Sequence, residues 1–416
     1  MLNVRVPALF FLLALANPSL AQSTESDRLR AEIEALRLEF AARITAIEAR
    51  IKAVEGPGGA APPQAPAVQP GLPSTEALPA DIPKAPEAPI MAPPSTGSKM
   101  FNPDVAAIGD FIGAAGKSPG GGEPSLEFHE AEVSFQAVVD PYARADVFLT
   151  FGPDEVGVEE AFITFPTLPG GLLMKVGRMR DAFGKINGTH NHVLPFPDRP
   201  LMTQNLLGGE EGLGDSGLSV SRLFPNRFAF IEATGQVYRG ESSIFTAEKR
   251  KDLAYVSHLR AYRDLTESTN IDLGGSFARG HNEGGPGATT RLFGADATFR
   301  YRPLRRSIYT HLLARGEVAW SRRSELPGPS AFGAYGYLEY QFARRWTAGT
   351  RLDTADRAHD PAIRDKGASF LLTYAPSEFS LIRGQLRHTR LGDGQRSNEF
   401  LFQFLFSIGA HGAHPF

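Results

Sequence analysis

Two pairs of histidines are the residues in this sequence with the clearest capacity for chemistry. His190 and His192 flank Asn191, and His411 and His414 lie near the end of the chain. Imidazole nitrogens bind zinc, but a zinc site needs three or four converging ligands. Whether these histidines can form a site therefore depends on the elements that position them.

Motifs for catalysis are missing from the sequence. It contains no cysteine, so it has no disulfide, no thiolate nucleophile and no thiolate metal ligand. It has no Gly-x-Ser-x-Gly element, and none of its 10 histidines stands in a nucleophile-activating motif. An enzyme is therefore not predicted.

The first histidine pair lies in segment 181–214, the longest strand-free stretch in the C-terminal three-quarters of the chain. An irregular segment of this length inside a compact domain usually has a function. Its charged residues are Asp181, Lys185, Asp198, Arg199, Glu210 and Glu211. Two interpretations stay open: these charges act on solutes at a constriction, or they only attach the segment to a neighbouring wall.

From residue 105 to the end of the chain, apolar residues recur with a period of two, which is typical of β-strands. In one example, Phe293, Ala295, Ala297, Phe299 and Tyr301 alternate with Gly294, Asp296, Thr298 and Arg300. Sixteen strands are predicted, at 105–112, 125–139, 142–151, 157–165, 171–180, 215–223, 227–238, 252–264, 269–279, 290–302, 307–322, 331–343, 345–353, 366–375, 378–390 and 398–409.

The predicted connections alternate between tight turns and mostly longer loops, among them 113–124, 181–214 and 354–365. This alternation over an even number of strands is the signature of a transmembrane barrel with both termini in the periplasm. We therefore predict an all-β, antiparallel barrel of about 16 strands over 105–416, with 14 or 18 strands as alternatives. In this topology the two histidine pairs lie on opposite sides of the membrane, so they are not expected to form one shared site. No metal site is predicted, and no cofactor is predicted either.

The two faces of the predicted strands differ in character. On the last strand Phe400, Phe402, Phe404 and Phe406 share one face, which is expected to meet lipid. The opposite faces carry charges of both signs, which predicts a water-filled lumen without strong cation or anion selectivity. The lumen charges are Arg144, Arg260, Arg300, Arg315, Arg351, Arg383 and Arg387, with Glu130, Glu132, Asp146, Glu160, Asp296, Glu317, Glu339 and Asp353.

Three stretches resemble porin-type outer-membrane proteins related to the phosphate-selective porin O/P group. They are FNPDVAAIGDF (101–111), GRMRDAFGKIN (177–187) and HVLPFPDRPLMTQNLLGGEEGLGDSGLSVSRL (192–223). The resemblance covers most of 101–416 and implies the general porin architecture, in which a long third loop, here 181–214, folds inward and narrows the pore. The mixed charge of this loop departs from the strongly basic conduit of the phosphate-selective members. The terminal Phe416 resembles the signal that the outer-membrane barrel assembly machinery reads.

The first 21 residues have the features of a secretory signal peptide. Arg5 precedes an apolar run, and Ser19 and Ala21 fit a cleavage site after Ala21. The alternative, a membrane anchor, is disfavoured because the run is shorter than the roughly 20 residues that span a bilayer. No later apolar run is long enough to predict a transmembrane helix.

A periplasmic coiled-coil helix is predicted over 22–55, followed by a Pro/Ala-rich linker over 56–104. The apolar seam of the helix follows a heptad pattern with one stutter and consists of Leu29, Ile33, Leu36, Phe40, Ile44, Ile47, Ile51 and Val54. An isoleucine-rich seam favours more than two strands, so a homotrimer is expected. The alternative is an amphipathic helix that lies on the barrel or on the inner leaflet.

The function predicted from these features is passive diffusion of small hydrophilic solutes or ions through an outer-membrane porin. One alternative is a TonB-dependent receptor, although segment 22–104 offers no recognisable plug domain. Another is a structural protein with a closed barrel, whose coiled coil contacts peptidoglycan. The formal net charge of −3 and the lack of a basic tract do not predict nucleic acid as a partner.

Overall fold

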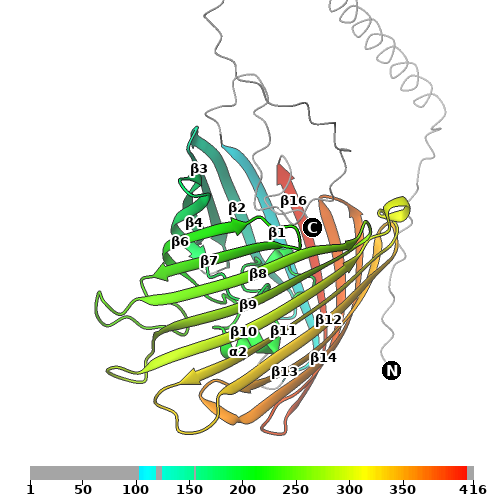
Figure 1. The fold of residues 1–416 in the computed structure, drawn as a ribbon. Coiled ribbons are helices and arrows are strands. Elements are labelled where there is room, and N and C mark those ends of the chain that lie inside the picture. Colours follow the sequence, from blue (N-terminus) through cyan, green and yellow to red (C-terminus); the bar gives the residue numbers. More distant parts are fainter. Residues whose placement is uncertain (1–102, 119–123, 154–155, 410–416) are drawn as a thin grey trace, which may run out of the picture. The chain divides into compact units, whose positions relative to one another are not determined.

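A closed barrel of antiparallel strands forms the described part of the chain in the computed structural model (Figure 1). The structure describes residues 103–118, 124–153 and 156–409. The chain divides into two units, Met1–Asp81 and Ile82–Phe416, and all described residues belong to the second. The predicted signal peptide and coiled-coil helix, the second histidine pair and the terminal phenylalanine lie outside the described residues, as does all but the end of the predicted linker.

The described residues contain sixteen strands, and each pairs with its neighbours in the sequence. The ring is closed by β1 and β16, whose register places Ala106 opposite Gly409. The strands are β1 (Asp104–Lys117), β2 (Glu127–Asp140), β3 (Ala143–Phe151), β4 (Val156–Leu168), β5 (Leu172–Arg180), β6 (Gly214–Phe224), β7 (Phe230–Tyr238), β8 (Ala254–Thr266), β9 (Thr269–His281), β10 (Thr289–Tyr301), β11 (His311–Arg323), β12 (Ala331–Ala343), β13 (Trp346–Arg357), β14 (Asp360–Ser377), β15 (Ser380–Arg390) and β16 (Arg396–Gly409).

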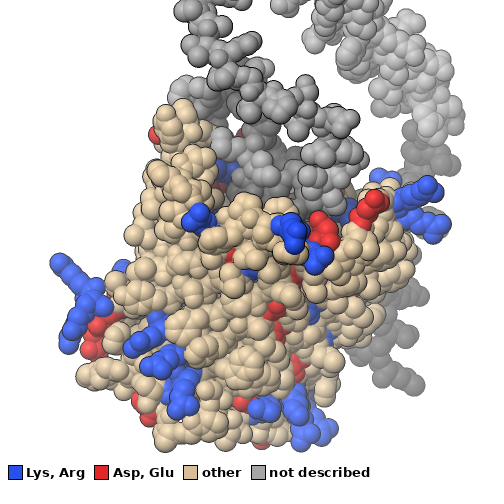
Figure 2. All heavy atoms as spheres, in the orientation of Figure 1, with Lys and Arg blue, Asp and Glu red and all other residues tan. Residues whose placement is uncertain are grey.

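Side chains alternate between an apolar outer face and a polar inner face, because successive residues of a strand point to opposite sides of the sheet. On β13, Leu352 is 64% exposed, whereas its neighbours Arg351 and Asp353 are buried. On β10, Phe293 is 48% exposed and Asp296 is buried. On the face shown in Figure 2, most lysines and arginines lie toward the two ends of the strands, and the surface between them consists largely of other residues.

Tight turns join several consecutive strands, and the residue types in these turns favour that conformation. The carboxylate of Asp140 accepts a hydrogen bond from the backbone N–H of Tyr142 at 2.7 Å. The side chain of Asn226 accepts from the N–H groups of Phe228 and Ala229 at 2.9 and 3.0 Å. Asp and Asn favour turns because their side chains bond to the backbone two or three residues on.

The predicted number of strands, their antiparallel arrangement and the closure of the barrel are confirmed. Several boundaries are wrong. β1 ends at Lys117 and not at residue 112, so residues 113–117 belong to the strand and not to the predicted loop. Residues 354–365 are not a long loop, because β13 and β14 continue above the apolar band and pair Asp356 with Arg364. Residues 307–310 are not part of β11, because the short 3-10 helix η2 (Leu304–Arg306) and a hydrogen-bonded turn after it occupy this connection.

Segment 181–213 connects β5 to β6 and is called the β5–β6 segment below. It contains the 3-10 helix η1 (Asn191–Val193) and the short α-helix α2 (Leu201–Leu206). α2 packs against strands β11 to β14 (Figure 1). Among the described helices, none has the length and apolar character needed to cross a membrane.

Candidate functional site

The β5–β6 segment is bonded to strands all round the barrel. Hydrogen bonds join its backbone or side chains to side chains on β2, β4, β7, β9, β11, β13, β14 and β15. Each of these strand side chains lies on the polar face of the sheet, opposite the apolar face described above. The segment is therefore the candidate functional site, and its contacts decide which charges remain available to a solute.

Asp198 is the most heavily bonded acid of the segment. Its Oδ2 accepts hydrogen bonds from Arg351 Nη2 at 2.7 Å and from Arg387 Nη1 at 2.9 Å, and its Oδ1 accepts from Gln385 Nε2 at 2.7 Å. Burial would raise the pKa of Asp198, but the charges of Arg351 and Arg387 outweigh it and lower the pKa to about 2. Asp198 is thus an ionised anchor between the segment and strands β13 and β15.

A glycine allows the segment to approach β11 closely. Gly184 has a φ of 64°, and a Cβ at this position would lie 2.3 Å from Glu317 Oε2. The two following N–H groups, of Lys185 and Ile186, donate to the same carboxylate at 3.0 and 2.9 Å, and the Tyr335 hydroxyl donates at 2.6 Å. Glu317 therefore serves to hold the segment.

Lys185 extends from this contact to the next strand pair. Its Nζ lies 2.6 Å from Asp272 Oδ2, and Arg260 binds the same carboxylate through two hydrogen bonds of 2.8 Å. The side chain of Asp272 is buried, whereas those of Lys185 and Arg260 are 21% and 22% exposed. Two cations share one buried acid here, and Arg260 also lies 4.0 Å from Glu232.

Arg199 organises the segment itself and is not paired with its neighbour Asp198. Its guanidinium donates to Asn191 Oδ1 at 2.8 Å and to the carbonyl oxygens of Ile186 and Thr189 at 3.2 and 2.9 Å. These bonds hold two parts of the segment together, the stretch around residues 186–191 and the stretch around Arg199. The guanidinium is nearly fully buried, so Arg199 acts as an internal brace.

Apolar side chains of the segment pack against apolar side chains of the barrel strands. Phe183, Ile186 and Phe196 are at most 1% exposed and share one cluster with Leu292 of β10 and Tyr337 of β12. The guanidinium of Arg351 also lies over the Phe196 ring, 4.3 Å from its centroid. The segment therefore has a hydrophobic core of its own, which sequence alternation alone did not predict.

The remaining predicted charges of the segment differ in exposure. Asp181 is 2% exposed, and burial together with the charge of Asp215 raises its pKa to about 8. Glu210 and Glu211 are exposed. Of the predicted constriction charges, only these two acids and the Lys185 ammonium are positioned to meet solvent, while Asp198 and Arg199 are held in buried contacts.

Both histidines of the segment lie among acids of the barrel wall. His190 Nδ1 lies 2.6 Å from Glu132 Oε2, and its Nε2 lies 2.8 Å from Glu160 Oε2. Burial would lower the pKa of His190, but these two hydrogen bonds and the charge of Glu159 outweigh it and raise the pKa to about 10. His192 Nδ1 lies 3.8 Å from Glu132 Oε2. The two imidazoles and Glu132 could hold a metal ion.

Eight of the predicted lumen charges contact the segment. Glu132, Glu160, Glu317, Arg351 and Arg387 do so as described. Glu130 Oε1 lies 3.6 Å from His192 Nδ1, Asp353 Oδ1 accepts from the N–H of Leu201 at 3.3 Å, and Arg383 Nη1 donates to the carbonyl oxygen of Leu194 at 2.9 Å. The others bond within the wall or to neighbouring strands. Arg144 lies 2.8 Å from Asp146, Arg315 donates to Thr298 at 3.3 Å, and Glu339 accepts from the Tyr337 hydroxyl at 2.6 Å. Arg300 Nη1 is buried without a hydrogen-bond partner among the described residues.

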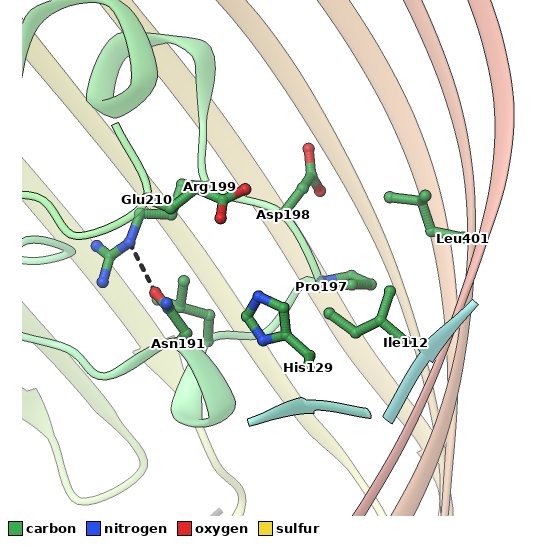
Figure 3. A pocket seen from close by; sticks show the side chains of 9 residues that line it. Ile112, His129, Asn191, Pro197, Asp198, Arg199, Glu210 and Leu401 are labelled. Carbon is green, nitrogen blue, oxygen red and sulfur yellow. Dashed lines mark hydrogen bonds between the residues drawn. The ribbon is translucent and has the colours of Figure 1, made fainter. Parts of the chain in front are cut away.

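A small cavity lies where the segment meets β1, β2 and β16 (Figure 3). Its lining includes His129, Asn191, Asp198 and Leu401, and Figure 3 shows the hydrogen bond between Arg199 and Asn191 at its edge. The volume of about 10 Å³ is roughly the room that one water molecule needs. This cavity is a packing gap and not a solute pocket.

Several contact residues were missed by sequence reasoning, among them Asp272, Gln385 and Glu159. Asp272 and Gln385 lie on predicted strands, but nothing in the alternation indicates that the segment reaches them. Glu159 lies next to Glu160, and a regular strand would point only one of them inward. Glu159 reaches the segment because of a β-bulge, and the alternation of residue types in the sequence does not reveal a bulge.

One relative in sequence is an uncharacterized protein of Aquifex aeolicus. It is 30% identical over 387 residues, an alignment that covers 76% of this chain and 81% of the relative. No family model matches the chain.

Solved barrels share the fold at low sequence identity. The anion-selective porin from Comamonas acidovorans is similar with a TM-score of 0.52 and 11% identity, over 74% of this chain and 99% of that one. OprB of Pseudomonas putida gives a TM-score of 0.53 and 9% identity, over 74% and 94%. The loop L8 deletion mutant of OmpT, an outer membrane protein of Vibrio cholerae, gives 0.51 and 10%, over 74% and 99%. The chain thus has the 16-stranded porin fold.

Proposed function

Because the chain belongs to the same family as the Aquifex aeolicus protein and has a porin fold, we propose that it is a passive diffusion channel of the outer membrane. The observation that carries this proposal is the alternation of an apolar outer face with a charged inner face around a closed ring. Leu352, Leu386 and Leu259 are 64%, 58% and 56% exposed on strands whose intervening residues are polar. Such a surface is stable in lipid and costly in water.

A ring of sixteen strands supports a diffusion channel in preference to a TonB-dependent receptor. Barrels of 16 to 18 strands leave an aqueous interior, whereas outer-membrane receptors have about 22 strands around a plug. Small hydrophilic solutes or ions are the proposed cargo, since the inner face carries both signs of charge. Phosphate is not proposed, because the segment and its surroundings offer acids as well as cations.

We propose that the β5–β6 segment crosses the interior and narrows the channel. The support is its hydrogen bonding to eight strands distributed round the ring, which a loop lying outside the mouth would not reach. Lys185, Glu210 and Glu211 are the segment charges with solvent access, so they are proposed to meet passing solutes. Asp198 and Arg199 instead keep the segment in place.

Assembly and location are proposed from the sequence. The coiled-coil helix of 22–55 is proposed to lie in the periplasm, to trimerise the chain and to contact peptidoglycan. The barrel is proposed to be inserted in outer-membrane lipid by the barrel assembly machinery. Cross-linking of the protein with and without residues 23–55 tests the trimer: an intact oligomer without this helix would show that the helix is not what holds it.

A second candidate function is a barrel closed by the same segment, which would leave the protein a structural role. The packing of Phe183 and Phe196 against Leu292 and Tyr337 favours this candidate, since apolar contact inside a barrel excludes water. Reconstitution into liposomes separates the two. Swelling in isotonic solutions of small sugars is expected for the channel, and the absence of swelling at every solute size would support closure.

A further inference from the structure

The two histidines of the β5–β6 segment lie among largely buried carboxylates, an arrangement suited to binding a metal ion. We propose that Glu132, His190 and His192 bind a divalent transition-metal ion of the Zn²⁺ type. Each residue offers one ligand atom within 4.8 Å of the others, and the three side chains are at most 2% exposed. The proposal does not depend on the proposed channel function.

The distances are close to those of a tetrahedral centre. With zinc–ligand bonds of about 2.0 to 2.1 Å, ligand atoms lie roughly 3.4 Å apart. His192 Nδ1 is 3.8 Å from Glu132 Oε2, and His190 Nδ1 is 2.6 Å from the same oxygen. The second distance needs to open by less than 1 Å, which is a change of side-chain torsion and not of the barrel.

Two further carboxylate oxygens lie close enough to serve as the fourth ligand. Glu130 Oε1 lies 3.6 Å from His192 Nδ1, and Glu159 Oε2 lies 3.5 Å from His190 Nδ1. Neither oxygen accepts a hydrogen bond from a described residue, although both are buried. The Glu159 side chain is only 7% exposed. An unbonded buried carboxylate oxygen is costly, and a metal ion would satisfy it.

The far nitrogen of His190 has the support that metal-binding histidines require. Its Nε2 lies 2.8 Å from Glu160 Oε2. When Nδ1 releases its proton to bind the ion, Nε2 keeps the other proton and donates it to Glu160. A carboxylate in this position orients the ring and makes the ligand nitrogen more basic. Glu160 is thus a positioning residue for the metal ligand.

Two irregularities of the sheet bring these acids together. Opposite Phe148 and Leu149 the register of β4 shifts so that Glu159 and Glu160 both reach His190. A second shift falls on β2 beside Glu130, between the pairs Asp110–Glu130 and Phe111–Phe128. β-Bulges re-aim side chains and are frequent at functional sites. Regular strands would have pointed one member of the Glu159–Glu160 pair away.

The charge of the cluster and the types of its donor atoms favour one class of ion over others. Four carboxylates lie within 3.6 Å of a nitrogen of His190 or His192, and only one of them, that of Glu159, forms a salt bridge with an arginine, Arg180, among the described residues. The local excess of carboxylates attracts a cation, and the two imidazole nitrogens favour zinc-type ions over Ca²⁺ and Mg²⁺, which prefer oxygen. A bound ion would tie the β5–β6 segment to β2 and β4.

Zinc titration of the full mature chain in detergent tests this site. The chain carries no histidine tag, and His411→Ala with His414→Ala removes the other histidine pair. Isothermal titration calorimetry should show one tight Zn²⁺ site per chain, and Co²⁺ should give the visible absorption of a tetrahedral complex. A lack of Zn²⁺ binding, or preference for Ca²⁺ or Mg²⁺, would overturn the proposal.

Matched variants locate the site within the chain. His190→Ala with His192→Ala should weaken Zn²⁺ binding at least 100-fold, whereas His311→Ala should leave it unchanged, because His311 also bonds to a carboxylate, Glu339, but lies outside both metal-type groups among the described residues. Glu160→Gln preserves side-chain shape and should weaken binding 10- to 100-fold, with Co²⁺ absorption reporting a changed geometry. Full Zn²⁺ affinity in the double histidine variant would refute the assignment. If the double variant does not fold, the Glu160→Gln variant still tests the site, and full Zn²⁺ affinity there would also contradict the assignment.

Discussion

Replacing Asp198 by asparagine removes the charge at the centre of the contact between the β5–β6 segment and the barrel wall. Asp198 accepts hydrogen bonds from Arg351, Arg387 and Gln385, and its side chain is only 5% exposed. Asparagine keeps the size of the side chain but offers one acceptor oxygen instead of two. Arg351 then retains Asp353, whereas its contact with the segment carries no opposite charge.

The size of the effect follows from the pKa. A shift from 3.8 to about 2 corresponds to roughly 2 to 3 kcal/mol of stabilisation of the docked segment. Breaking a buried ion pair by removing one partner typically costs about 3 to 5 kcal/mol. Both estimates indicate about 3 kcal/mol, or roughly a hundredfold change in the population of the open segment. The folded pKa is depressed, so this stability is present above about pH 4 and is lost as the pH falls toward 2.

Hydrogen exchange of the amides in 195–207 measures the docking directly. Asp198→Asn should speed their exchange roughly a hundredfold while the amides of the surrounding strands keep their protection. In the wild type, exchange corrected for its intrinsic pH dependence should accelerate between pH 4 and pH 2, and this acceleration should be absent from the variant. Open-channel current noise should increase in parallel.

Asp393→Asn is the matched control, since Asp393 is an exposed turn residue. Among the described residues it accepts hydrogen bonds from Gln395 alone and lies 3.8 Å from Arg357. It should leave the exchange of 195–207 unchanged. Equal exchange rates in Asp198→Asn and the wild type would show that the charge of Asp198 does not hold the segment, and the reasoning from buried ion pairs would then be wrong.

Three further changes test other contacts. Gly184→Ala places a Cβ 2.3 Å from Glu317 in a left-handed backbone, so the amides of Lys185 and Ile186 should lose at least about 1 kcal/mol of exchange protection; unchanged protection would contradict the close approach. Leu352→Arg puts a charge on the outer face and should lower the free energy of unfolding in lipid vesicles by about 2 to 4 kcal/mol, read from urea titration; no loss would argue against lipid contact there. Lys185→Met removes an accessible cation beside Asp272 and should shift the reversal potential in a KCl gradient toward cation preference, whereas an unchanged potential would place Lys185 away from the ion path.

The architecture of the barrel could be predicted because strand alternation and connection length are local properties of the sequence. The predicted strand at 331–343 coincides with β12. The predicted strand ends were wrong where the strands extend beyond the membrane, because apolar and polar residues need not alternate there. Residues 354–365 are polar because the ends of β13 and β14 lie beyond the apolar band, and polar composition there resembles a loop.

The candidate site could be predicted only in part, because its contacts join residues far apart in the sequence. The extent of the segment could be predicted from its lack of alternation, and its six charges were named as candidates. Their roles were not, since pairing of Asp198 with Arg351 and Arg387 depends on a path that no local pattern encodes. The acids around His190 were similarly hidden, because a bulge at Glu159 breaks the period of two.

Single-channel recording with and without residues 185–210 tests the central claim most directly. The purified protein should open in discrete steps in planar bilayers, and replacing 185–210 by a short Gly/Ser linker should increase the conductance of each step. Equal conductance of the two proteins would contradict a narrowing by the β5–β6 segment. A silent wild type would contradict the channel itself, and conduction by the deletion variant alone would identify the segment as a plug.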